Sequence, residues 1–200
     1  MDYKEYYSNR DVISLFSGAM GLDIGLGQAG LNVVIGQDFD QSCVDTMKAN
    51  GHKVLGGDIQ KIQPQEILEL TGLHVGEPFM ICGGPPCQPF STAGKRLGIN
   101  DPRGSLFMEF IRMIDYIRPR FFVMENVKGI MSAPLKHVPR AKKSEKDEND
   151  PEQKLGTVLD VILSEFNKLG YKTVYGILDA VNYGVPQFRE RFVLIGSRDH

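Results

Sequence analysis

The chain has 200 residues, of which 42% are hydrophobic and 24% are charged, values that are ordinary for a soluble globular protein. This length allows one α/β domain with a proper core and is too short for two. Lysine and arginine (23) are balanced by aspartate and glutamate (25), and the net charge of −2 argues against a stand-alone nucleic-acid-binding domain. If the chain acts on nucleic acid, the binding must come from a local basic patch or from another region.

Membrane, secreted and zinc-dependent classes are also disfavoured. No apolar run reaches the length of a membrane span, and the first residues lack the apolar region of a signal peptide. Three cysteines, Cys43, Cys82 and Cys87, cannot form a full disulfide framework, so we expect a reducing cytoplasm. The four histidines are scattered without the Cys/His spacing of a metal site, and we expect no zinc.

The first part of the chain alternates short apolar runs with turns and helical patterns. A strand over residues 11–16 leads through a glycine turn into a helix that ends near Gly30. Strand, turn and helix form the usual cradle for a nucleotide-like cofactor. Further strands are predicted at 32–38, 53–55 and 79–82, and helices at 41–50 and 64–71.

A literal G-x-G-x-x-G pattern covers residues 25–30. It begins nine residues after the first strand, so it cannot form the strand-to-helix turn of a dinucleotide site. We predict instead that Gly30 ends the helix.

An acid, Asp38, ends the second strand about 20 residues after the glycine turn, where ribose hydroxyls are bound in such folds. The adjacent Phe39 could stack on an adenine ring. Alternatively, Asp38 is a solvated acid that caps the helix over 41–50. The residues alone leave both interpretations open.

Residues 83–91, GGPPCQPFS, place a cysteine directly after a buried strand. Two glycines and three prolines mark a turn, from which the sulfur of Cys87 could reach a bound substrate. A cis-proline turn with an incidental buried thiol is the competing interpretation, which this motif alone favours. The glycine-bearing, basic segment 92–103 is predicted to be a mobile lid, with an ordinary surface loop as the alternative.

The second part of the chain continues the α/β pattern. Ser105 is predicted to cap a helix over 106–117, whose apolar residues belong to the core. A buried strand over 120–124 ends on Glu125, and a carboxylate there lies at the active edge of an α/β sheet unless it only caps a helix.

The remaining segments belong to the same single domain, which we expect to extend over residues 1–200 and to be incomplete. The lysine- and acid-rich stretch 134–153 is predicted to be a mobile surface insertion. A helix over 155–169 starts with apolar Leu155. Two strands over 171–180 and 192–197 are predicted to be antiparallel at the sheet edge.

Six ordered signals, each at a predicted strand end, together resemble the cytosine-C5 DNA methyltransferase family. They are residues 16–21, Asp38-Phe39, Gly57-Asp58-Ile59, Pro86-Cys87-Gln88, Glu125-Asn126-Val127 and Gln187-x-Arg189-x-Arg191. Each signal is weak alone, but the series covers nearly the whole chain. The resemblance implies a Rossmann-like S-adenosylmethionine-dependent methyltransferase fold, mostly parallel, with helices on both faces.

The resemblance also implies the catalytic roles. The Cys87 thiolate would add to C6 of a flipped-out cytosine, which makes C5 able to accept a methyl group. Glu125 would hold the N3 edge and, protonated, stabilise the charge on the ring. Arg191 would hold O2, with Arg189 beside it, because residues i and i+2 of an extended segment point the same way. A surface ion pair with Glu190, or packing against the insertion at 134–153, is the structural alternative for these arginines.

The implied cofactor is S-adenosylmethionine, and its site falls on the turns that follow the strands. The positions carried over are Phe16, Gly18, Ala19, Gly21 and Leu22 for the methionine part, Asp38 for the ribose, Phe39, Asp58 and Ile59 for the adenine, and Pro86 and Leu106 for the rest of the pocket.

Two departures from the family pattern stand out. Met20 occupies a position where the family usually has glycine, so the cofactor turn is expected to be altered. In the family, the target-recognition domain and a final cofactor-pocket segment follow the position of Arg191, and neither is in this chain. We therefore expect double-stranded DNA as the partner, with recognition supplied by a downstream region or a second polypeptide.

The leading hypothesis is thus the catalytic portion of a bacterial DNA cytosine-C5 methyltransferase of a restriction-modification system, incomplete by itself. A tRNA cytosine methyltransferase shares these motifs. A non-catalytic subunit that binds cofactor or a partner is a third hypothesis, against which the intact Cys87, Glu125 and Arg191 argue. A Rossmann dehydrogenase is the most distant one.

Overall fold

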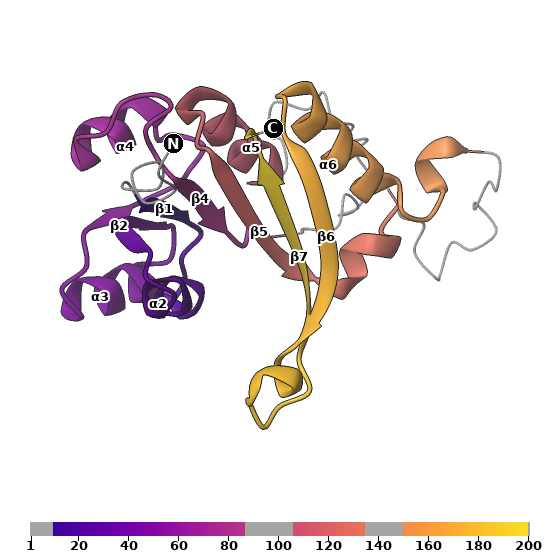
Figure 1. Cartoon of the computed structure of the whole chain (residues 1–200), viewed down its shortest axis with the longest axis horizontal. Coiled ribbons are helices and arrows are strands. Elements are labelled where there is room, and N and C mark those ends of the chain that lie inside the picture. The colour runs from indigo at the N-terminus through magenta and orange to yellow at the C-terminus, as the bar shows by residue number, and fades with distance from the viewer. Residues whose placement is uncertain (1–9, 87–105, 135–149, 200) are drawn as a thin grey trace, which may run out of the picture.

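The computed structural model describes residues 10–86, 106–134 and 150–199 and contains a seven-stranded sheet (Figure 1). The strand order is β3-β2-β1-β4-β5-β7-β6; the first five are parallel, and β7 runs antiparallel to both of its neighbours. The strands are β1 (Asp11–Leu15), β2 (Asn32–Asp38), β3 (Val54–Gly56), β4 (Met80–Gly83), β5 (Phe121–Val127), β6 (Lys172–Asp179) and β7 (Glu190–Ser197). The predicted mostly parallel α/β fold is confirmed.

Helices lie on both faces of this sheet, as predicted. α2 and α3 pack on one face, and α4, α5 and α6 pack on the other (Figure 1). Their bounds are α2 (Gly21–Gln28), α3 (Gln41–Ala49), α4 (Pro64–Thr71), α5 (Leu106–Ile117) and α6 (Thr157–Lys168), with short 3-10 turns η1 (Lys128–Ser132), η3 (Pro151–Gln153) and η4 (Ala180–Tyr183).

The alternation of side chains along β1 shows why the sheet is covered on both sides. Ile13 and Leu15 enter the larger core beneath α4, α5 and α6, whereas Val12 faces α2 with Met80. All three β1 residues are fully buried. Burying an aliphatic side chain of this size stabilises a fold by roughly 1.5–3 kcal/mol, so this central strand anchors both layers.

An aromatic cluster joins α6 to the sheet. The rings of Phe122 and Phe166 are stacked with centroids 3.9 Å apart, and Tyr171 meets Phe122 edge-on at 5.3 Å. The Tyr171 hydroxyl donates a 2.6 Å hydrogen bond to the Pro119 carbonyl. Gly196 of β7 faces the Phe122 ring, where a Cβ atom would lie 1.9 Å from Cε1, so this strand position requires glycine.

The end of α2 confirms the interpretation of the G-x-G-x-x-G pattern. Gly30 has φ 84° and donates its N–H to the Gly27 carbonyl, and Leu31 donates to Leu26. These two bonds form a Schellman motif, in which a glycine with positive φ ends a helix. The pattern therefore lies in and after α2, not in the turn that precedes it.

The start of α6 differs from the prediction. α6 begins at Thr157 after Gly156, whose φ of 85° is outside the helical region, and Leu155 is 70% exposed before it. The predicted start at residue 155 is wrong because Leu155 fits the helical spacing of the apolar residues by chance, whereas Gly156 breaks the helix. Ser105, most of the predicted insertion at 134–153 and the predicted lid at 92–103 lie outside the described residues.

The strands at the carboxyl end of the chain form a long hairpin. β6 and β7 are antiparallel, as predicted, and the segment that joins them extends away from the sheet (Figure 1). Residues 181–190 are all exposed, including Phe188 at 87%. Within the described ranges, no helix has the length and apolar character needed to cross a membrane.

Tyr171 is expected to make the free energy of unfolding fall at alkaline pH. Burial raises the pKa of Tyr171 from 10 to about 12, so its contribution to stability is complete below pH 10 and is lost as the pH rises towards 12. At pH 7, Tyr171→Phe should cost about 1 kcal/mol, because the Pro119 carbonyl keeps its bond from Arg198 Nε. Urea unfolding should show the wild-type and variant stabilities crossing between pH 10 and 12. Parallel curves would contradict this account.

Candidate active site

The carboxyl ends of the parallel strands gather the predicted cofactor residues at one edge of the sheet. Leu15, the last residue of β1, is level with Gln37 of β2 and Gly83 of β4. The segments that follow these three residues therefore lie side by side. Such an edge is where α/β folds bind ligands.

The turn after β1 has an unusual backbone. Phe16, Gly18 and Met20 have φ values of 54°, 56° and 64°, in the left-handed region. For a residue with a side chain this conformation costs roughly 1–2 kcal/mol, so the surroundings must stabilise it. The Gly18 N–H donates a 2.7 Å hydrogen bond to Asp38 Oδ2, which ties the turn to the end of β2.

The structure separates the two interpretations of Asp38. Asp40, not Asp38, caps α3, accepting from the N–H groups of Ser42 and Cys43. The Ser42 hydroxyl, followed by these N–H groups, lowers the pKa of Asp40. Asp38 accepts instead from Gly18 and from the Asp40 N–H at 2.9 Å. Each carboxylate oxygen of Asp38 keeps a second acceptor position that a ligand hydroxyl could use.

The predicted adenine residues follow β2 and β3. Phe39 is 76% exposed, so its ring is free of core packing. Asp58 is half-buried, and its Oδ1 accepts from the Gln60 N–H at 3.1 Å. The Ile59 side chain is buried in the main core and its carbonyl accepts from Arg112 Nη2, so a ligand would meet the Ile59 backbone and not its side chain.

The other positions predicted to shape the cofactor pocket flank this edge. Gly21 begins α2, and Ala19 and Gly21 are exposed beside it. Leu22 is 37% exposed, Pro86 is exposed and Leu106 is half-buried at the start of α5.

A buried amide, Gln37, also lies at this edge and was not among the predicted site residues. It is 1% exposed and bonds to backbone groups of two of these loops. The sequence signal that could have identified Gln37 is its position: a polar residue next to Asp38, in a strand that is otherwise mostly apolar.

Glu125 and Arg191 are brought together by the antiparallel pairing of β5 with β7. Arg191 is level with Val127, two residues from Glu125 on the same side of β5. Arg191 Nε and Glu125 Oε1 are 2.7 Å apart. The pairing of β5 with β7 thus places these two side chains in contact.

Arg189 and Glu190 have other partners. The Glu190 carboxylate pairs with Lys128 Nζ at 2.8 Å, and the Glu190 backbone carbonyl accepts from Arg191 Nη1 at 2.9 Å. Arg189 precedes β7 and is exposed, and its backbone N–H donates to Asp179 Oδ1.

The two glycines before Cys87 pass close to their neighbours, and close packing requires glycine at residue 83. A Cβ atom on Gly83 would lie 2.3 Å from the Leu15 carbonyl oxygen, and one on Gly84 would lie 3.1 Å from Glu125 Oε2. Gly84 therefore passes directly beside the Glu125 carboxylate. Cys87 itself lies outside the described residues.

Asn126 fixes the segment that leads to Cys87. Its side chain is buried, and Nδ2 donates a 2.9 Å hydrogen bond to the Pro85 carbonyl. The Glu-Asn-Val motif contained this residue, but the sequence alone assigned it no role. We expect it to set the approach of residues 84–86 to Glu125.

The two described cysteines are poorly suited to nucleophilic chemistry. Cys82 is fully buried, and burial, with help from the nearby Asp23 carboxyl, raises its thiol pKa to about 12. Desolvation and then the charges of Asp38 and Asp40 raise the pKa of Cys43. Since the thiolate is the reactive form, neither is an activated sulfur.

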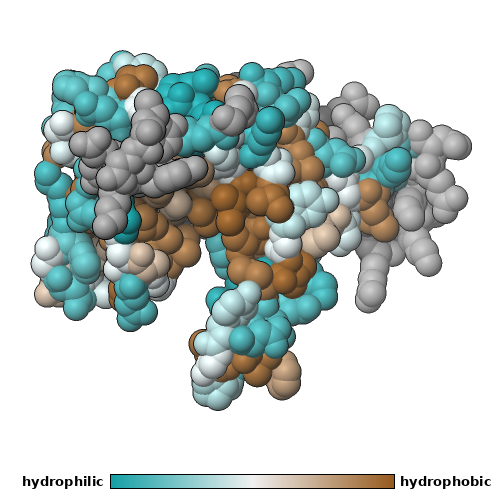
Figure 2. Space-filling model, in the orientation of Figure 1, coloured by the Kyte–Doolittle hydropathy of each residue, from teal (hydrophilic) through white to brown (hydrophobic). Residues whose placement is uncertain are grey.

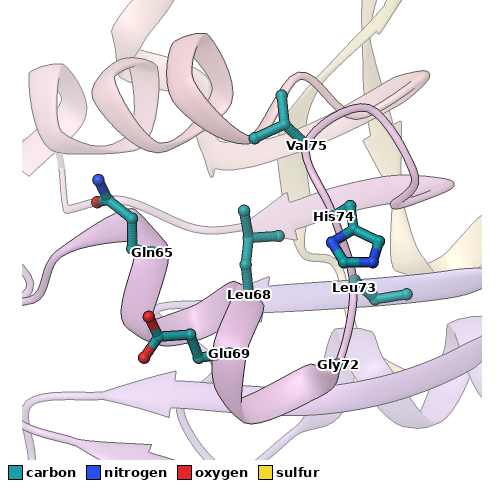
Figure 3. A pocket seen from close by; sticks show the side chains of 7 residues that line it. All are labelled: Gln65, Leu68, Glu69, Gly72, Leu73, His74 and Val75. Atoms are coloured by element: carbon teal, nitrogen blue, oxygen red, sulfur yellow. The ribbon is translucent and has the colours of Figure 1, made fainter.

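A cavity of about 280 Å³ lies away from this edge (Figure 3). It is formed by α4 and the loop that follows, which leads into the amino end of β4. Its lining is Gln65, Leu68, Glu69, Gly72, Leu73, His74 and Val75. It contains no nucleophile, and among the described residues no group of three or more His, Cys, Asp or Glu is placed to hold a metal ion.

Comparison with known proteins matches this arrangement of strand-end motifs to one family. The family model for C-5 cytosine-specific DNA methylases matches residues 10–200. The chain belongs to this family. A Rossmann dehydrogenase is thereby excluded as its family.

Similar proteins are named type II methyltransferases. M.AquIA of Picosynechococcus sp. is 40% identical over 94% of this chain and 72% of its own length. M.FnuDI of Fusobacterium nucleatum is 38% identical over 94% of this chain and 46% of its own length. A crystal structure of Spodoptera frugiperda DNMT2 superposes with a TM-score of 0.68 at 25% identity, covering 96% of this chain and 51% of that one. The chain thus spans about half the length of most of these relatives.

Met20 in the cofactor turn gives a second test. Its side chain is buried with Val44 and Met47, although its backbone is left-handed. Met20→Ala should lose roughly 2–4 kcal/mol of unfolding free energy through lost packing. Met20→Gly loses the same side chain but removes about 1 kcal/mol of backbone strain. Urea unfolding should therefore rank the glycine variant above the alanine variant, and the reverse order would show that the turn is unstrained.

Proposed function

We propose that this chain is the catalytic portion of an enzyme that transfers a methyl group from S-adenosylmethionine to C5 of cytosine in DNA. The observation that carries the proposal is the Glu125–Arg191 pair, whose Glu125 carboxylate lies beside Gly84, three residues before Cys87. A carboxyl group, a guanidinium and a cysteine-bearing loop are thereby drawn to one place. The cofactor cradle at β1 and β2 is immediately beside it.

The residues at the β1–β3 edge fit S-adenosylmethionine, which supplies an activated methyl group. The backbone of the Phe16–Met20 turn would receive the methionine part. Free acceptor positions on Asp38 suit the ribose hydroxyls, and exposed Phe39 suits the adenine face. Asp58 and the Ile59 N–H would take the adenine edge.

The catalytic residues then act on the cytosine. The Cys87 thiolate forms a bond to C6, and the ring electrons move towards C5 and N3. Glu125, in its protonated form, donates to N3, and Arg191 donates to O2. C5 would accept the methyl group, with S-adenosylhomocysteine as the leaving group. Loss of the C5 proton to a base from solvent then restores the C5–C6 double bond and expels the thiolate, and the N3 proton returns to Glu125. Arg191 carries five N–H donors, so it can hold Glu125 and O2 together.

DNA is favoured over tRNA because the matching family model is described as a C-5 cytosine-specific DNA methylase, and because curated relatives with up to 40% identity are named type II methyltransferases. A restriction-modification role follows from the same similarity. We place the enzyme in the cytoplasm, where a reducing environment keeps a thiolate nucleophile intact.

We further propose that the rest of the enzyme covers an open face of the sheet. On the side of α2, a row of apolar residues crosses three strands: Val123 of β5 is level with Ile195 of β7, which is level with Val174 of β6. Ile195 is 42% exposed and Val174 is 65% exposed. Figure 2 shows the resulting apolar surface over this part of the sheet. Patches of this kind mark interaction sites, and the occupant we propose is the region that the longer relatives carry in addition.

Covalent trapping tests the proposed chemistry. In duplex DNA with 5-fluorocytosine, fluorine cannot leave as the C5 proton does, so a working enzyme stays bonded to the DNA. With S-adenosylmethionine, a form with the downstream region should give an adduct at Cys87, and residues 1–200 alone should not. Cys87→Ala should abolish the adduct with cofactor affinity intact, whereas Asp38→Ala should weaken affinity first. No DNA adduct from either form, with an adduct on tRNA, would overturn the DNA assignment.

The open face predicts a measurable apolar surface. The dye ANS should bind the folded chain, and Ile195→Lys should lower its fluorescence by at least half without loss of stability. Val75→Lys is the matched control, since Val75 is 53% exposed at the distant α4 cavity. Ile195→Lys should also prevent co-purification with the downstream region. Equal dye binding by both variants, or retained co-purification, would contradict the proposed docking.

A further inference from the structure

Gln37 of β2 connects two loops of the cofactor edge through its side chain. Its Oε1 accepts a 3.4 Å hydrogen bond from the Phe16 N–H in the turn after β1. Its Nε2 donates a 2.8 Å hydrogen bond to the Gly57 carbonyl after β3. The residue is 1% exposed, so both ends of the amide are bonded away from water. One side chain thus spans from the turn after β1 to the loop after β3.

The backbone of Gln37 strengthens the same connection. Its N–H donates to Ser17 Oγ at 3.2 Å, and its carbonyl accepts from the Ser17 N–H at 2.9 Å. Ser17 Oγ also donates to Ser14 Oγ at 2.8 Å. The turn after β1 is therefore held to β2 at successive residues, and the Gln37 side chain extends this hold to β3.

Both backbone groups that the amide bonds belong to residues with positive φ. Phe16 has φ 54° and Gly57 has φ 130°. A left-handed phenylalanine needs external bonds to persist, and Gln37 supplies one. An amide buried without partners would be unfavourable, so this residue is stable at this position because both loops adopt these conformations.

We propose that Gln37 is a positioning residue that couples the methionine-binding turn to the adenine-binding loop. This inference rests on the proposed S-adenosylmethionine site. Phe16 begins the turn for one end of the cofactor, and Gly57 adjoins Asp58, which serves the other end. With Gln37 in place, the two loops keep a fixed spacing before the cofactor arrives, so less ordering is needed on binding. Gln37 itself need not touch the cofactor.

Two substitutions separate coupling from simple filling of space. Gln37→Leu removes both side-chain bonds while keeping similar bulk. Gln37→Glu keeps an oxygen that accepts from the Phe16 N–H. When the carboxyl is ionised, its second oxygen carries no proton, so it faces the Gly57 carbonyl oxygen and cannot donate to it. When protonated, that oxygen can donate to Gly57 as the amide does. Burial favours the protonated carboxyl, which brings its titration into an accessible pH range.

The measurement is calorimetric titration with S-adenosylhomocysteine at pH 8 and at about pH 5.5. At pH 8, both variants should bind roughly ten- to a hundredfold more weakly than wild type, as expected for losing a buried amide bond pair. At the lower pH, Gln37→Glu should recover most of its affinity and Gln37→Leu should recover none. Asp38 and Asp58, the charged groups beside these loops, are present in all three proteins, so a difference between the two variants is assigned to position 37.

A control and a cofactor-free readout complete the test. Ile35→Val removes a buried methyl group from the same strand and should leave affinity unchanged while lowering stability. In the absence of cofactor, hydrogen exchange of the Phe16 amide should be faster in Gln37→Leu than in Ile35→Val. Because Gln37→Glu has the wild-type shape, its recovery at low pH remains informative even if Gln37→Leu does not fold.

The outcomes are distinguishable. Two results would overturn the role of Gln37 and leave the cofactor site standing. In the first, Gln37→Leu binds S-adenosylhomocysteine within twofold of wild type. In the second, the affinity of Gln37→Glu relative to Gln37→Leu is the same at both pH values. Wild type without any affinity would overturn the cofactor site and this inference together.

Discussion

The parallel pairing of β1 with β2 on one side and β4 on the other is the constraint on which both halves of the site depend. It brings Leu15 level with Gln37 and with Gly83, so the cofactor turn and the cysteine-bearing loop leave the sheet at the same edge. The contact is close enough that Gly83 cannot carry a side chain, since a Cβ atom would meet the Leu15 carbonyl at 2.3 Å. A shift of either pairing by one residue would reverse every side chain and separate the two halves.

The two halves are held by different means. The cofactor half relies on hydrogen bonds between side chains and backbone groups: the Gly18 N–H donates to Asp38, the Phe16 N–H donates to Gln37, and Gln37 donates to the Gly57 carbonyl. These bonds preserve a backbone that is unfavourable by itself. The cytosine half relies on side chains of β5 and β7, namely the Glu125–Arg191 pair and the bond from Asn126 to Pro85. The bonds of the first half join the turn after β1, β2 and the loop after β3, whereas Glu125 and Arg191 of the second half lie on the same side of the sheet as Val123 and Ile195.

Local sequence signals predicted most elements, because periodicity and turn residues act over short distances. β2 and α4 have the predicted bounds, and Gly30 ends α2 as expected. What the sequence left undecided depended on contacts between distant residues. Asp38 and Asp40 both precede α3, and only the Gly18 N–H, 20 residues away, determines which one caps it. The same holds for Gln37, whose partners lie about 20 residues before and after it, and for the 66-residue separation of Glu125 and Arg191.

The most direct test of a preformed cofactor edge is an NMR titration of this chain with S-adenosylhomocysteine. The account predicts saturable shifts of the amide signals of Gly18, Phe39 and Asp58, at the ends of β1, β2 and β3. Signals from Leu68 and Val75, at the α4 cavity, should stay in place. Shifts confined to that cavity, or none at the three strand ends at saturating ligand, would contradict the claim that these ends form the cofactor site.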